Sequence, residues 1–566
     1  MSKSIYEDLG EERKQLQLIG KLPSWFTTSG WQMLKEKYVT TEHPDLYSIY
    51  KRVSNSAAKH MGAERAYYEK AFFNIMWNGY LALSTPVLAN MGTERGCPVS
   101  CSGNYVGDSI YDFYEGQKEN AVLTQNAFGT SSYLGDIRGR GQPIATGGKA
   151  SGVLPVLKDF IQLSRDVSQG STRRGAWAGY IEIDSIDFWE VALHILNNPD
   201  DCNVGWLVSD AFIAKLDAGD KDAQAIYRRS LYVKMRTGKG YFVFIDKINA
   251  LNPSMYAEHG LKVRASNLCT EITLHSDEFH TFTCVLSSMN LAKYDEWKDT
   301  DAVQIATIFL DCVAEEFIRI GRGIRGLEKA VRFTESGRAL GLGTLGFHTY
   351  LQQHMLPLDS MEAHQVNISI FKEIKDEAVK ASKLMAKLKG EPKWCVGSGR
   401  RNTHLLAIAP NSSSALICGS VSQGIEPVYK NVFVQGSPAG EINRINPTLL
   451  QLCKETGRYS EQLISRIIAN MGSIQGLEEF SELEQQVFKT AFEWEQDVLL
   501  RLASARQRHI CQAQSLNLFY PAEATEAEIS RIHKLAFKDP WIKSLYYLRS
   551  EAGVRGSTGE CVACEG

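Results

Sequence analysis

The sequence predicts an α/β protein that begins with a helical region. Two short apolar runs, residues 241–245 (YFVFI) and 404–409 (HLLAIA), indicate strands. Longer segments with helical spacing separate such runs, for example residues 302–320 (AVQIATIFLDCVAEEFIRI). Before them, residues 5–83 carry apolar residues three and four apart, as in YYEKAFFNIMWNGYLAL, with no strand-like alternation. Alternating strands and helices after a helical start favour an α/β core with helical additions.

The composition indicates a globular chain built around one dominant catalytic domain. It has 566 residues, of which 44% are hydrophobic and 22% charged, so a sizeable core is expected. Lys and Arg number 62 against 65 for Asp and Glu, which argues against nucleic acid as a partner. The first twenty residues are too highly charged for a signal peptide, and no apolar run reaches about 18 residues. We therefore expect a cytoplasmic protein without a membrane partner.

Twelve cysteines in a chain of this length are too few for a disulfide scaffold, so each thiol needs its own explanation. Six stand singly in mixed or apolar surroundings, where buried packing is the better interpretation: Cys202, Cys312, Cys395, Cys418, Cys453 and Cys511. The other six fall in motifs: Cys97, Cys101, Cys269, Cys284, Cys561 and Cys564.

The segment 267–271 (NLCTE) places an amide, a thiol and a carboxylate close together. If it forms a strand, Asn267, Cys269 and Glu271 share one face. An amide can hold a substrate hydroxyl, a carboxylate can take its proton, and a thiol can act as nucleophile, reductant or hydrogen-atom donor. A chance triple on a half-exposed strand explains the spacing equally well. A Cys–His hydrolase is disfavoured, because His275 and His280 lie past a charged turn and are expected to be surface residues.

A second motif suits phosphate binding. In residues 404–419 (HLLAIAPNSSSALICG) an apolar strand leads into Pro and small hydroxyl residues that open a helix. Backbone N–H groups and the hydroxyls of Ser412, Ser413 and Ser414 can hold phosphate at that helix start. A simple helix cap is the alternative, although one serine would be enough for it.

Several motifs together resemble the catalytic subunit of a class I ribonucleotide reductase. They are SNLCTEI followed by CVLSSMNL, the upstream segments STPVLANMGT and SCSGNYVGDSI, the downstream YYLRS, and a terminal cysteine pair. The resemblance runs in order from about residue 20 to the end. It implies a ten-stranded α/β barrel of the ribonucleotide reductase and glycyl-radical type over residues 84–548. A helical region at 1–83 and a redox-active tail at 549–566 flank it.

The resemblance also implies roles for the central residues. Cys269 matches the cysteine that becomes a thiyl radical and removes the hydrogen atom from C3′ of the ribose. Glu271 matches the base for the 3′-hydroxyl proton, and Asn267 matches the amide that hydrogen-bonds the ribose hydroxyls. Cys101 and Cys284 match the two thiols that reduce C2′ and end as a disulfide, so they are expected on neighbouring elements. Cys97 competes with Cys101 but lacks its seven-residue spacing to Asp108, and we interpret it as a bystander.

Radical supply and re-reduction follow from two further matches. Tyr546 and Tyr547 match the tyrosine pair that relays the oxidising equivalent from a metal-bearing small subunit, so this chain itself needs no bound cofactor. A cobalamin-dependent reductase, which needs no such pair, is the alternative. Cys561 and Cys564 form a CxxC whose tether of 14 residues after Tyr547 reaches about 45 to 50 Å. They match the shuttle that passes electrons from thioredoxin or glutaredoxin. Half of a zinc site is the less favoured interpretation.

Substrate and effector positions complete the resemblance. Thr85 and Ser100 match residues that line the substrate site. Further positions match those that contact a nucleoside triphosphate effector or face the substrate base: Asp108, Ser109, Ile110, Arg138, Gln169 and Arg174. The chain reaches its helical region almost at once, so we expect no ATP-binding cone and no dATP shut-off through one. Residues 111–134 differ from the sequence usual in the family at this place. They therefore do not decide whether the chain retains specificity control or forms a homodimer.

Two other functions each explain part of the sequence. A protein dithiol oxidoreductase explains Cys561 and Cys564 alone, and a nucleotide-binding regulatory protein explains the phosphate and effector loops alone. Neither explains Asn267, Cys269 and Glu271 together with the tyrosine pair. The predicted activity is reduction of ribonucleotides, as diphosphates, to 2′-deoxyribonucleotides for DNA synthesis.

Overall fold

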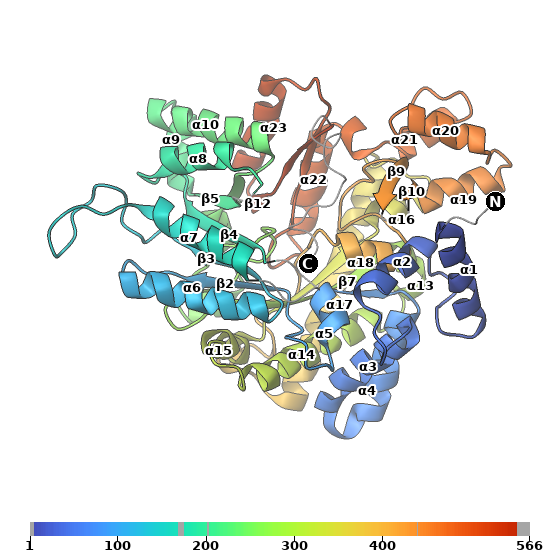
Figure 1. Ribbon diagram of the computed structural model, residues 1–566, viewed down its shortest axis with the longest axis horizontal. Coiled ribbons are helices and arrows are strands. Elements are labelled where there is room, and N and C mark those ends of the chain that lie inside the picture. The colour runs from blue at the N-terminus through green and yellow to red at the C-terminus, as the bar shows by residue number, and fades with distance from the viewer. Residues whose placement is uncertain (1–4, 168–174, 201–202, 438–439, 552–566) are drawn as a thin grey trace.

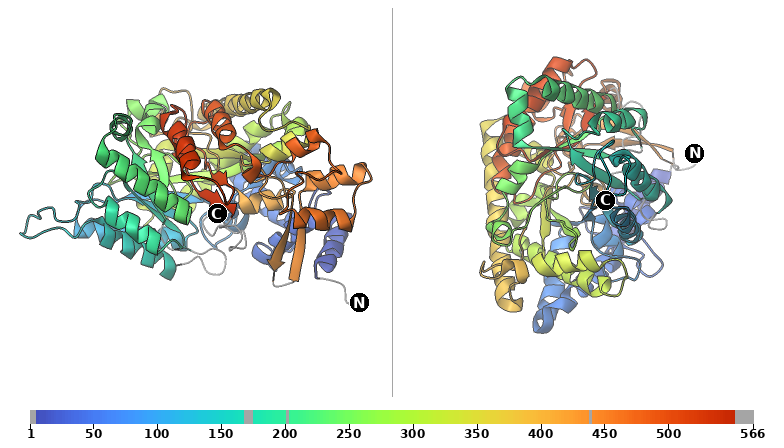
Figure 2. Two further views of the ribbon diagram at one scale, coloured as in Figure 1. Left: turned by 90° about the horizontal axis from the view of Figure 1, so that it is seen from above. Right: turned by 90° about the vertical axis from the view of Figure 1, so that its left-hand side faces the viewer.

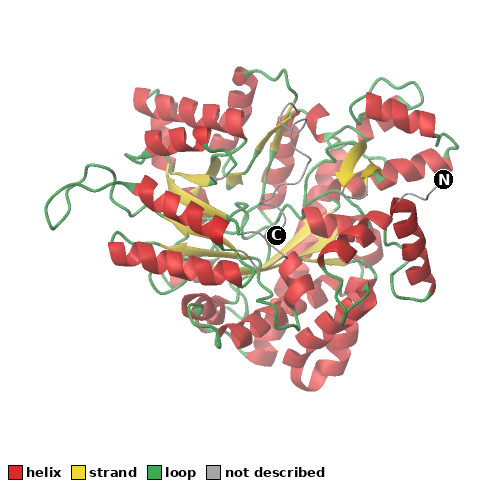
Figure 3. Ribbon diagram, viewed as in Figure 1, coloured by secondary structure: helices red, strands yellow, loops and turns green. Residues whose placement is uncertain are grey.

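The computed structural model describes residues 5–167, 175–200, 203–437 and 440–551. A strongly curled sheet crosses the middle of the molecule, and helices cover it on the outside (Figure 3). The N-terminal helices lie at one side of the sheet, and the helices that join its parallel strands lie at the other (Figures 1 and 2). Within the described residues, no helix is long and apolar enough to cross a membrane.

The N-terminal region is helical, as predicted, but it ends earlier than expected. An Asp45–Ser48 capping box starts its third helix, because the Asp45 carboxylate accepts the Ser48 N–H at 2.7 Å. Phe72 of the fourth helix packs edge-on against Phe309, with ring centroids 5.3 Å apart. After Trp77 the chain enters the sheet at residues 81–83 rather than continuing as helix. The helices are α1 (Ile5–Leu18), α2 (Thr28–Lys37), α3 (Leu46–Ala58), η1 (Lys59–Glu64) and α4 (Arg65–Trp77).

The main sheet has nine strands in the order β1-β7-β2-β3-β4-β5-β6-β12, with β8 paired to β7. Neighbours from β2 to β6 are parallel, as are β7 and β8, whereas β7 is antiparallel to β1 and β2. The strands are β1 (Leu81–Leu83), β2 (Cys101–Tyr105), β3 (Gly129–Tyr133), β4 (Trp177–Glu182), β5 (Val204–Val208), β6 (Tyr241–Phe244), β7 (Phe282–Asn290), β8 (Leu340–Leu345) and β12 (Ser544–Leu545).

The predicted strand at 241–245 is present as β6, but the one at 404–409 is reduced to isolated bridges. Leu406 bridges Leu342 of β8, and Ile408 bridges Gln514, so this segment continues the sheet beyond β8 without forming a full ladder. The described residues thus form one curled sheet of nine named strands, where ten strands were expected.

Crossover helices cover the parallel strands, as such connections require. The predicted helix at 302–320 is α14, which packs on α17 and on the N-terminal helices. A glycine-rich loop before α7 projects from the body at the left of Figure 1. The covering helices are α6 (Ile110–Gln125), α7 (Val153–Asp166), α8 (Phe188–Asn197), α9 (Asp210–Asp217), α10 (Lys221–Thr237), α14 (Ala302–Gly321), α15 (Glu328–Gly337), α16 (Phe347–Gln353) and α17 (Met361–Lys389).

The remaining elements are short or belong to the C-terminal third. Strands β11 and β13 pair in parallel and hold the segment before residue 551 against the body. These elements are α5 (Thr85–Asn90), α11 (Ile245–Ala250), α12 (Ser254–Glu258), η2 (Leu291–Lys293), α13 (Tyr294–Trp297), η3 (Lys393–Cys395), α18 (Ser412–Ile417), β9 (Val432–Ser437), β10 (Gly440–Ile445), α19 (Pro447–Glu455), α20 (Glu461–Ala469), α21 (Glu482–Val487), η4 (Ala491–Glu493), α22 (Gln496–Gln507), β11 (Leu518–Tyr520), α23 (Glu526–Lys538) and β13 (Leu548–Ser550).

A buried ionic network ties α14 to the second half of the sheet. The Asp311 carboxylate accepts from Arg338 Nε at 2.8 Å, from Arg401 Nε at 2.9 Å and from Asn402 Nδ2 at 3.0 Å. Both guanidinium groups hold the pKa of Asp311 well below its usual range despite the cost of burial. Since all three charged groups are buried, each depends on the others for charge compensation.

Candidate active site

The segment 267–271 is a turn and not the strand that its spacing suggested. The Thr270 N–H donates to the Asn267 carbonyl at 3.3 Å, and Thr270 adopts φ of 68°. Tyr180 on β4 donates its hydroxyl to the same carbonyl oxygen. The turn exists because these backbone groups bond locally and to neighbouring strands instead of forming a ladder.

The turn still brings the amide and the carboxylate together. Asn267 Nδ2 donates to Glu271 Oε1 at 2.9 Å and lies 3.2 Å from Cys101 Sγ, so one amide joins a carboxylate to a thiol. Ser515 Oγ donates to the second oxygen of Glu271 at 2.9 Å. Burial raises the pKa of Glu271 to about 7, and the hydrogen bonds from Ser515 and Asn267 limit the rise. A carboxyl with that pKa can take a proton near neutral pH.

Cys101 and Cys284 stand directly opposite each other across the antiparallel pair of β2 and β7. Opposed residues in such a pair have Cα atoms about 4.5 to 5.5 Å apart, which falls in the range of a disulfide. Burial raises the pKa of the Cys284 thiol, and Gln512 Nε2 lies 3.5 Å from its sulfur. Gly341 on β8 makes room for that sulfur, because a Cβ there would lie 2.8 Å from it.

The third thiol, Cys269, contacts an aromatic stack. The Tyr546 hydroxyl lies 3.5 Å from Cys269 Sγ, and the rings of Tyr546 and Tyr547 lie 4.2 Å apart between centroids. Tyr241 of β6 contacts both rings, at 4.6 and 5.2 Å. Lys234 of α10 is fully buried and donates to the Tyr546 carbonyl. Burial lowers the pKa of Lys234 to about 7.

Thr85 and the serines of α18, which are expected to line the substrate site, lie where two short helices begin. Thr85 opens α5, and its hydroxyl lies 2.9 Å from the Tyr38 hydroxyl. Ser414 in α18 donates to the Leu83 carbonyl at 2.8 Å, which brings the starts of α5 and α18 together. The hydroxyls of Ser84 and Ser100 are buried and have no partner among the described residues.

The three serines of α18 differ in their surroundings. Ser412 opens the helix after Asn411, which has φ of 58°, and donates to Gln423 at 3.1 Å. Ser413 is buried, and Ser414 is occupied by the bond to Leu83. The predicted helix that begins with these serines is thus present. The Ser414 hydroxyl, however, already donates to a protein partner.

The expected effector residues lie around the start of α6. Asp108 accepts from the Arg138 backbone N–H at 3.0 Å and from its Nε at 2.6 Å, which fixes the projecting loop against the helix. Ser109 caps α6 by accepting the Asp112 N–H at 3.1 Å, and the Ile110 side chain is exposed. Gln169 and Arg174 lie outside the described residues, as do the tail cysteines Cys561 and Cys564 and the single Cys202.

The bystander thiols are packed as expected. Cys97 is fully buried in the N-terminal core, and burial raises its pKa to about 12. The remaining single cysteines within the described residues are buried or partly buried: Cys312, Cys395, Cys418, Cys453 and Cys511. The prediction for His275 and His280 was wrong, because both side chains are largely buried and share Asp277.

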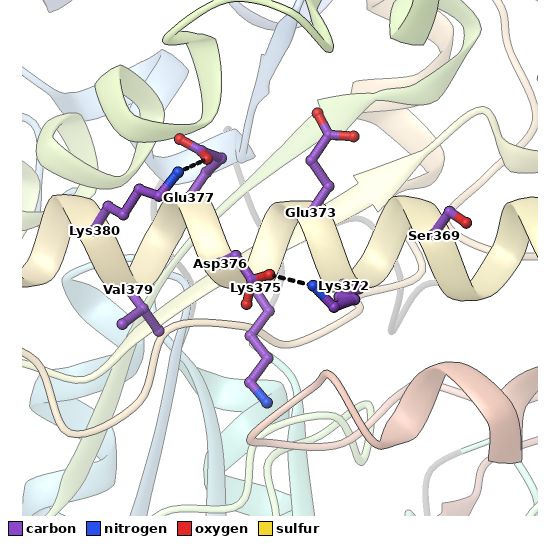
Figure 4. Close-up of a pocket in the computed structure, with 8 residues that line it drawn as sticks. All are labelled: Ser369, Lys372, Glu373, Lys375, Asp376, Glu377, Val379 and Lys380. Carbon is purple, nitrogen blue, oxygen red and sulfur yellow. Dashed lines mark hydrogen bonds and ion pairs between the residues drawn. The ribbon is translucent and has the colours of Figure 1, made fainter.

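A shallow depression on α17 has no part in this site. Figure 4 shows charged side chains along one helix, where Lys372 pairs with Asp376 and Lys380 with Glu377. Residues of α17 alone line it, and such self-paired charges are typical of a solvated helix face.

Comparisons with known proteins assign the family. A profile described as "Ribonucleotide reductase, barrel domain" matches residues 99–221, 214–398 and 392–548, and one described as "Ribonucleotide reductase, all-alpha domain" matches residues 24–96. The chain belongs to the ribonucleotide reductase large-subunit family. Both the predicted resemblance and the predicted fold class are thereby confirmed.

Individual relatives agree with this assignment. A putative ribonucleoside-diphosphate reductase large subunit of Frog virus 3 is 34% identical over 92% of this chain and 96% of its own length. The solved class Id ribonucleotide reductase alpha subunit of Actinobacillus ureae superposes with a TM-score of 0.87 at 36% identity, covering 94% of this chain and 98% of that one. A vitamin B12-dependent ribonucleoside-diphosphate reductase of Thermoplasma acidophilum is 28% identical over 87% of this chain and 66% of its own length.

Several contributors to the site carried no sequence signal. Gln512 and Ser515 belong to a segment with no motif, and Tyr180, Tyr241 and Lys234 are single residues in ordinary elements. Their contacts to the turn, to Cys284 and to the tyrosine pair arise only from the barrel.

Proposed function

We propose that the chain is the catalytic subunit of a class I ribonucleoside-diphosphate reductase that works with a metal-bearing second subunit. The observation that carries this proposal is the contact between the Tyr546 hydroxyl and Cys269 Sγ at 3.5 Å, with Tyr547 stacked behind. A continuous Tyr–Tyr–Cys series is a route for an oxidising equivalent into a buried site. The second subunit supplies that oxidising equivalent, because amino-acid side chains alone do not generate a thiyl radical.

In the proposed reaction Cys269, as a thiyl radical, removes the hydrogen atom from C3′ of the ribose and returns one at the end. Glu271 takes the 3′-hydroxyl proton and returns it to the 3′-oxygen before the product leaves, and Asn267 holds the ribose hydroxyls. Cys101 and Cys284 each give up one hydrogen, and the 2′-oxygen leaves as water. The products are a 2′-deoxyribonucleotide, one water and one disulfide, so two thiols account for both electrons. The mutual contacts of Asn267, Glu271 and Cys101 support this assignment.

Substrate phosphate is proposed to bind between the starts of α5 and α18. Ser84 and Ser100 offer buried hydroxyls with no partner among the described residues. Thr85 follows Ser84 in sequence, and the buried Ser413 lies in α18. Backbone N–H groups at a helix start favour an anion, and buried hydroxyls supply further donors. We assign the diphosphate as substrate because the relatives from Frog virus 3 and Thermoplasma acidophilum carry that substrate in their names.

The proposed partners follow from the same assignment. Cys561 and Cys564 would reduce the Cys101–Cys284 disulfide and be reduced in turn by thioredoxin or glutaredoxin. A second copy of the chain is proposed to dock on α6, where Ile110, Tyr111 and Tyr114 are 69%, 75% and 62% exposed. A nucleoside triphosphate effector would bind beside Asp108 and Arg138 at the start of that helix.

The decisive experiment follows deoxycytidine nucleotide formation from CDP and CTP under dithiothreitol. One reaction contains the metal-loaded second subunit, and the other contains adenosylcobalamin alone. We expect product from CDP only with the second subunit, and none with Tyr546→Phe or Cys269→Ser, whereas Tyr520→Phe, a buried tyrosine outside the stack, stays active. Product with adenosylcobalamin alone would replace the class I assignment by the cobalamin-dependent one.

A further inference from the structure

Two histidines and an aspartate meet between the catalytic turn and the strand that carries Cys284. His275, Asp277 and His280, here called the His–Asp–His cluster, offer ligand atoms that all lie within 4.8 Å of one another. The backbone at His275 forms an antiparallel bridge with Val263, so the cluster is anchored at the start of the segment. Nothing in the proposed radical chemistry uses these residues.

The spacing of the cluster suits one metal ion. His275 Nε2 lies 2.9 Å from Asp277 Oδ2, and His280 Nδ1 lies 2.9 Å from Asp277 Oδ1. Ligands bound at about 2.1 Å to one zinc ion lie about 3.0 to 3.4 Å apart at coordination angles of about 90° to 109°, close to these two spacings. Two imidazoles and a carboxylate are the ligand types that zinc and its divalent neighbours prefer.

The hydrogen bonds of His275 are compatible with metal ligation through Nε2. Its Nδ1 lies 2.8 Å from the Lys262 carbonyl oxygen, and the Lys262 N–H donates to the same nitrogen at 3.1 Å. Without a metal, Nδ1 accepts this N–H and Nε2 donates to Asp277 Oδ2. When a metal binds Nε2, the proton moves to Nδ1 and the ring donates to the Lys262 carbonyl, as metal-bound histidines do.

His280 presents its Nδ1 to the same carboxylate. This atom lies 2.9 Å from Asp277 Oδ1, which also accepts the backbone N–H groups of Phe279 and His280, both at 2.8 Å. His280 Nε2 is buried with no partner in the described part of the chain, so Nδ1 is the ring nitrogen that faces the other ligand atoms.

The shape of the site leaves one side open for the ion. The Trp394 indole packs against both imidazoles, with centroids 5.9 Å from His275 and 5.0 Å from His280. The Asp277 side chain remains 29% exposed, against 6% and 12% for the two histidines. An ion can therefore enter from the aspartate side and complete its shell with water.

We propose that the His–Asp–His cluster binds one divalent transition-metal ion of the zinc type through His275 Nε2, the Asp277 carboxylate and His280 Nδ1. The ion cross-links His275, Asp277 and His280 within the segment that joins the turn holding Glu271 to the strand holding Cys284. Its role is to stabilise the position of these two elements, and it is independent of the metal in the second subunit.

The test uses the full-length chain with Cys561→Ser and Cys564→Ser, because tail thiols would otherwise compete for the metal. The chain is titrated with Co²⁺ and followed by visible absorption, and zinc content is measured by mass spectrometry after dialysis. We expect one ion per chain, with bands of nitrogen and oxygen ligation. His280→Ala should weaken binding by more than about tenfold. Bound ion should also raise the melting temperature of the chain.

Two further variants separate ligation from folding. Asp277→Asn keeps an oxygen that accepts the Phe279 and His280 N–H groups, so the turn should persist while metal binding is lost. His354→Ala removes an exposed histidine outside the cluster, which bonds Asp295 and the Tyr350 carbonyl, and this variant should bind metal as the parent does. Absence of binding, binding unchanged by His280→Ala and Asp277→Asn, or strong thiolate charge-transfer bands would each overturn the proposal.

Discussion

Replacing Glu271 by Gln tests the proposed base with little change of shape. The Gln oxygen can still accept from Asn267 Nδ2, and the Gln N–H groups can donate to Ser515 Oγ, so both neighbours of Glu271 keep a partner. Only the proton-accepting function is removed. Because positioned general bases contribute about 10²- to 10⁴-fold, we expect a fall of that size in kcat.

The pH dependence of the unaltered chain gives a second, independent magnitude. Burial places the pKa of Glu271 at about 7, above the ordinary value for a glutamate. The carboxyl is therefore in its active, deprotonated form above that pH and becomes protonated as the pH falls. The deprotonated fraction is about 0.9 at pH 8 and about 0.09 at pH 6, so kcat/KM should drop about tenfold between them.

The assay is chromatographic measurement of dCDP formed from CDP with the second subunit and dithiothreitol at several pH values. Glu119→Gln is the matched control, because Glu119 is also a buried glutamate with a raised pKa but bonds Thr281 and Asn104. The Glu119→Gln variant should keep the rate of dCDP formation and its decrease at low pH. The reasoning fails if Glu271→Gln retains more than a tenth of the rate, or if the unaltered chain is equally active at pH 6 and 8.

Two further predictions concern the thiols and the buried ionic network. Cys101→Ser should abolish turnover with dithiothreitol, while Cys97→Ser should keep a near-normal rate; equal losses in dCDP assays of the two variants would contradict the assignment of the reducing pair. Asp311→Asn should destabilise the chain by about 3 to 5 kcal/mol, because the buried Arg338 and Arg401 then keep only the partly exposed Glu315 as a charged partner. Glu315→Gln should cost below about 1 kcal/mol, because the buried Asp311 remains. Urea unfolding measures the free energy of unfolding of both variants, and similar unfolding midpoints would refute the argument.

The local sequence pattern was sufficient to predict a helix or strand wherever residues close together in sequence determine the conformation. The helical spacing of 302–320 predicted α14, and the apolar run at 241–245 predicted β6, with errors of about one residue. Prediction from the local pattern failed where hydrogen bonds to residues distant in sequence favour another conformation. Alternation suggested a strand at 267–271, but Tyr180 and Ser515 bond this segment from other elements and stabilise a turn. Similarly, β1 exists because β7 pairs with it, a contact 200 residues away in the chain.

By itself, the sequence determined the family and the reactive groups, because the motifs carry residue types whose chemistry is fixed by their own functional groups. Only the tertiary structure could place Cys101 opposite Cys284, bring the Tyr546 hydroxyl to Cys269, and gather His275 with His280 around Asp277. It alone also raised the pKa of Glu271. Distances and burial depend on which segments pack together, and that is set by the free energy of the whole barrel rather than by neighbours in sequence.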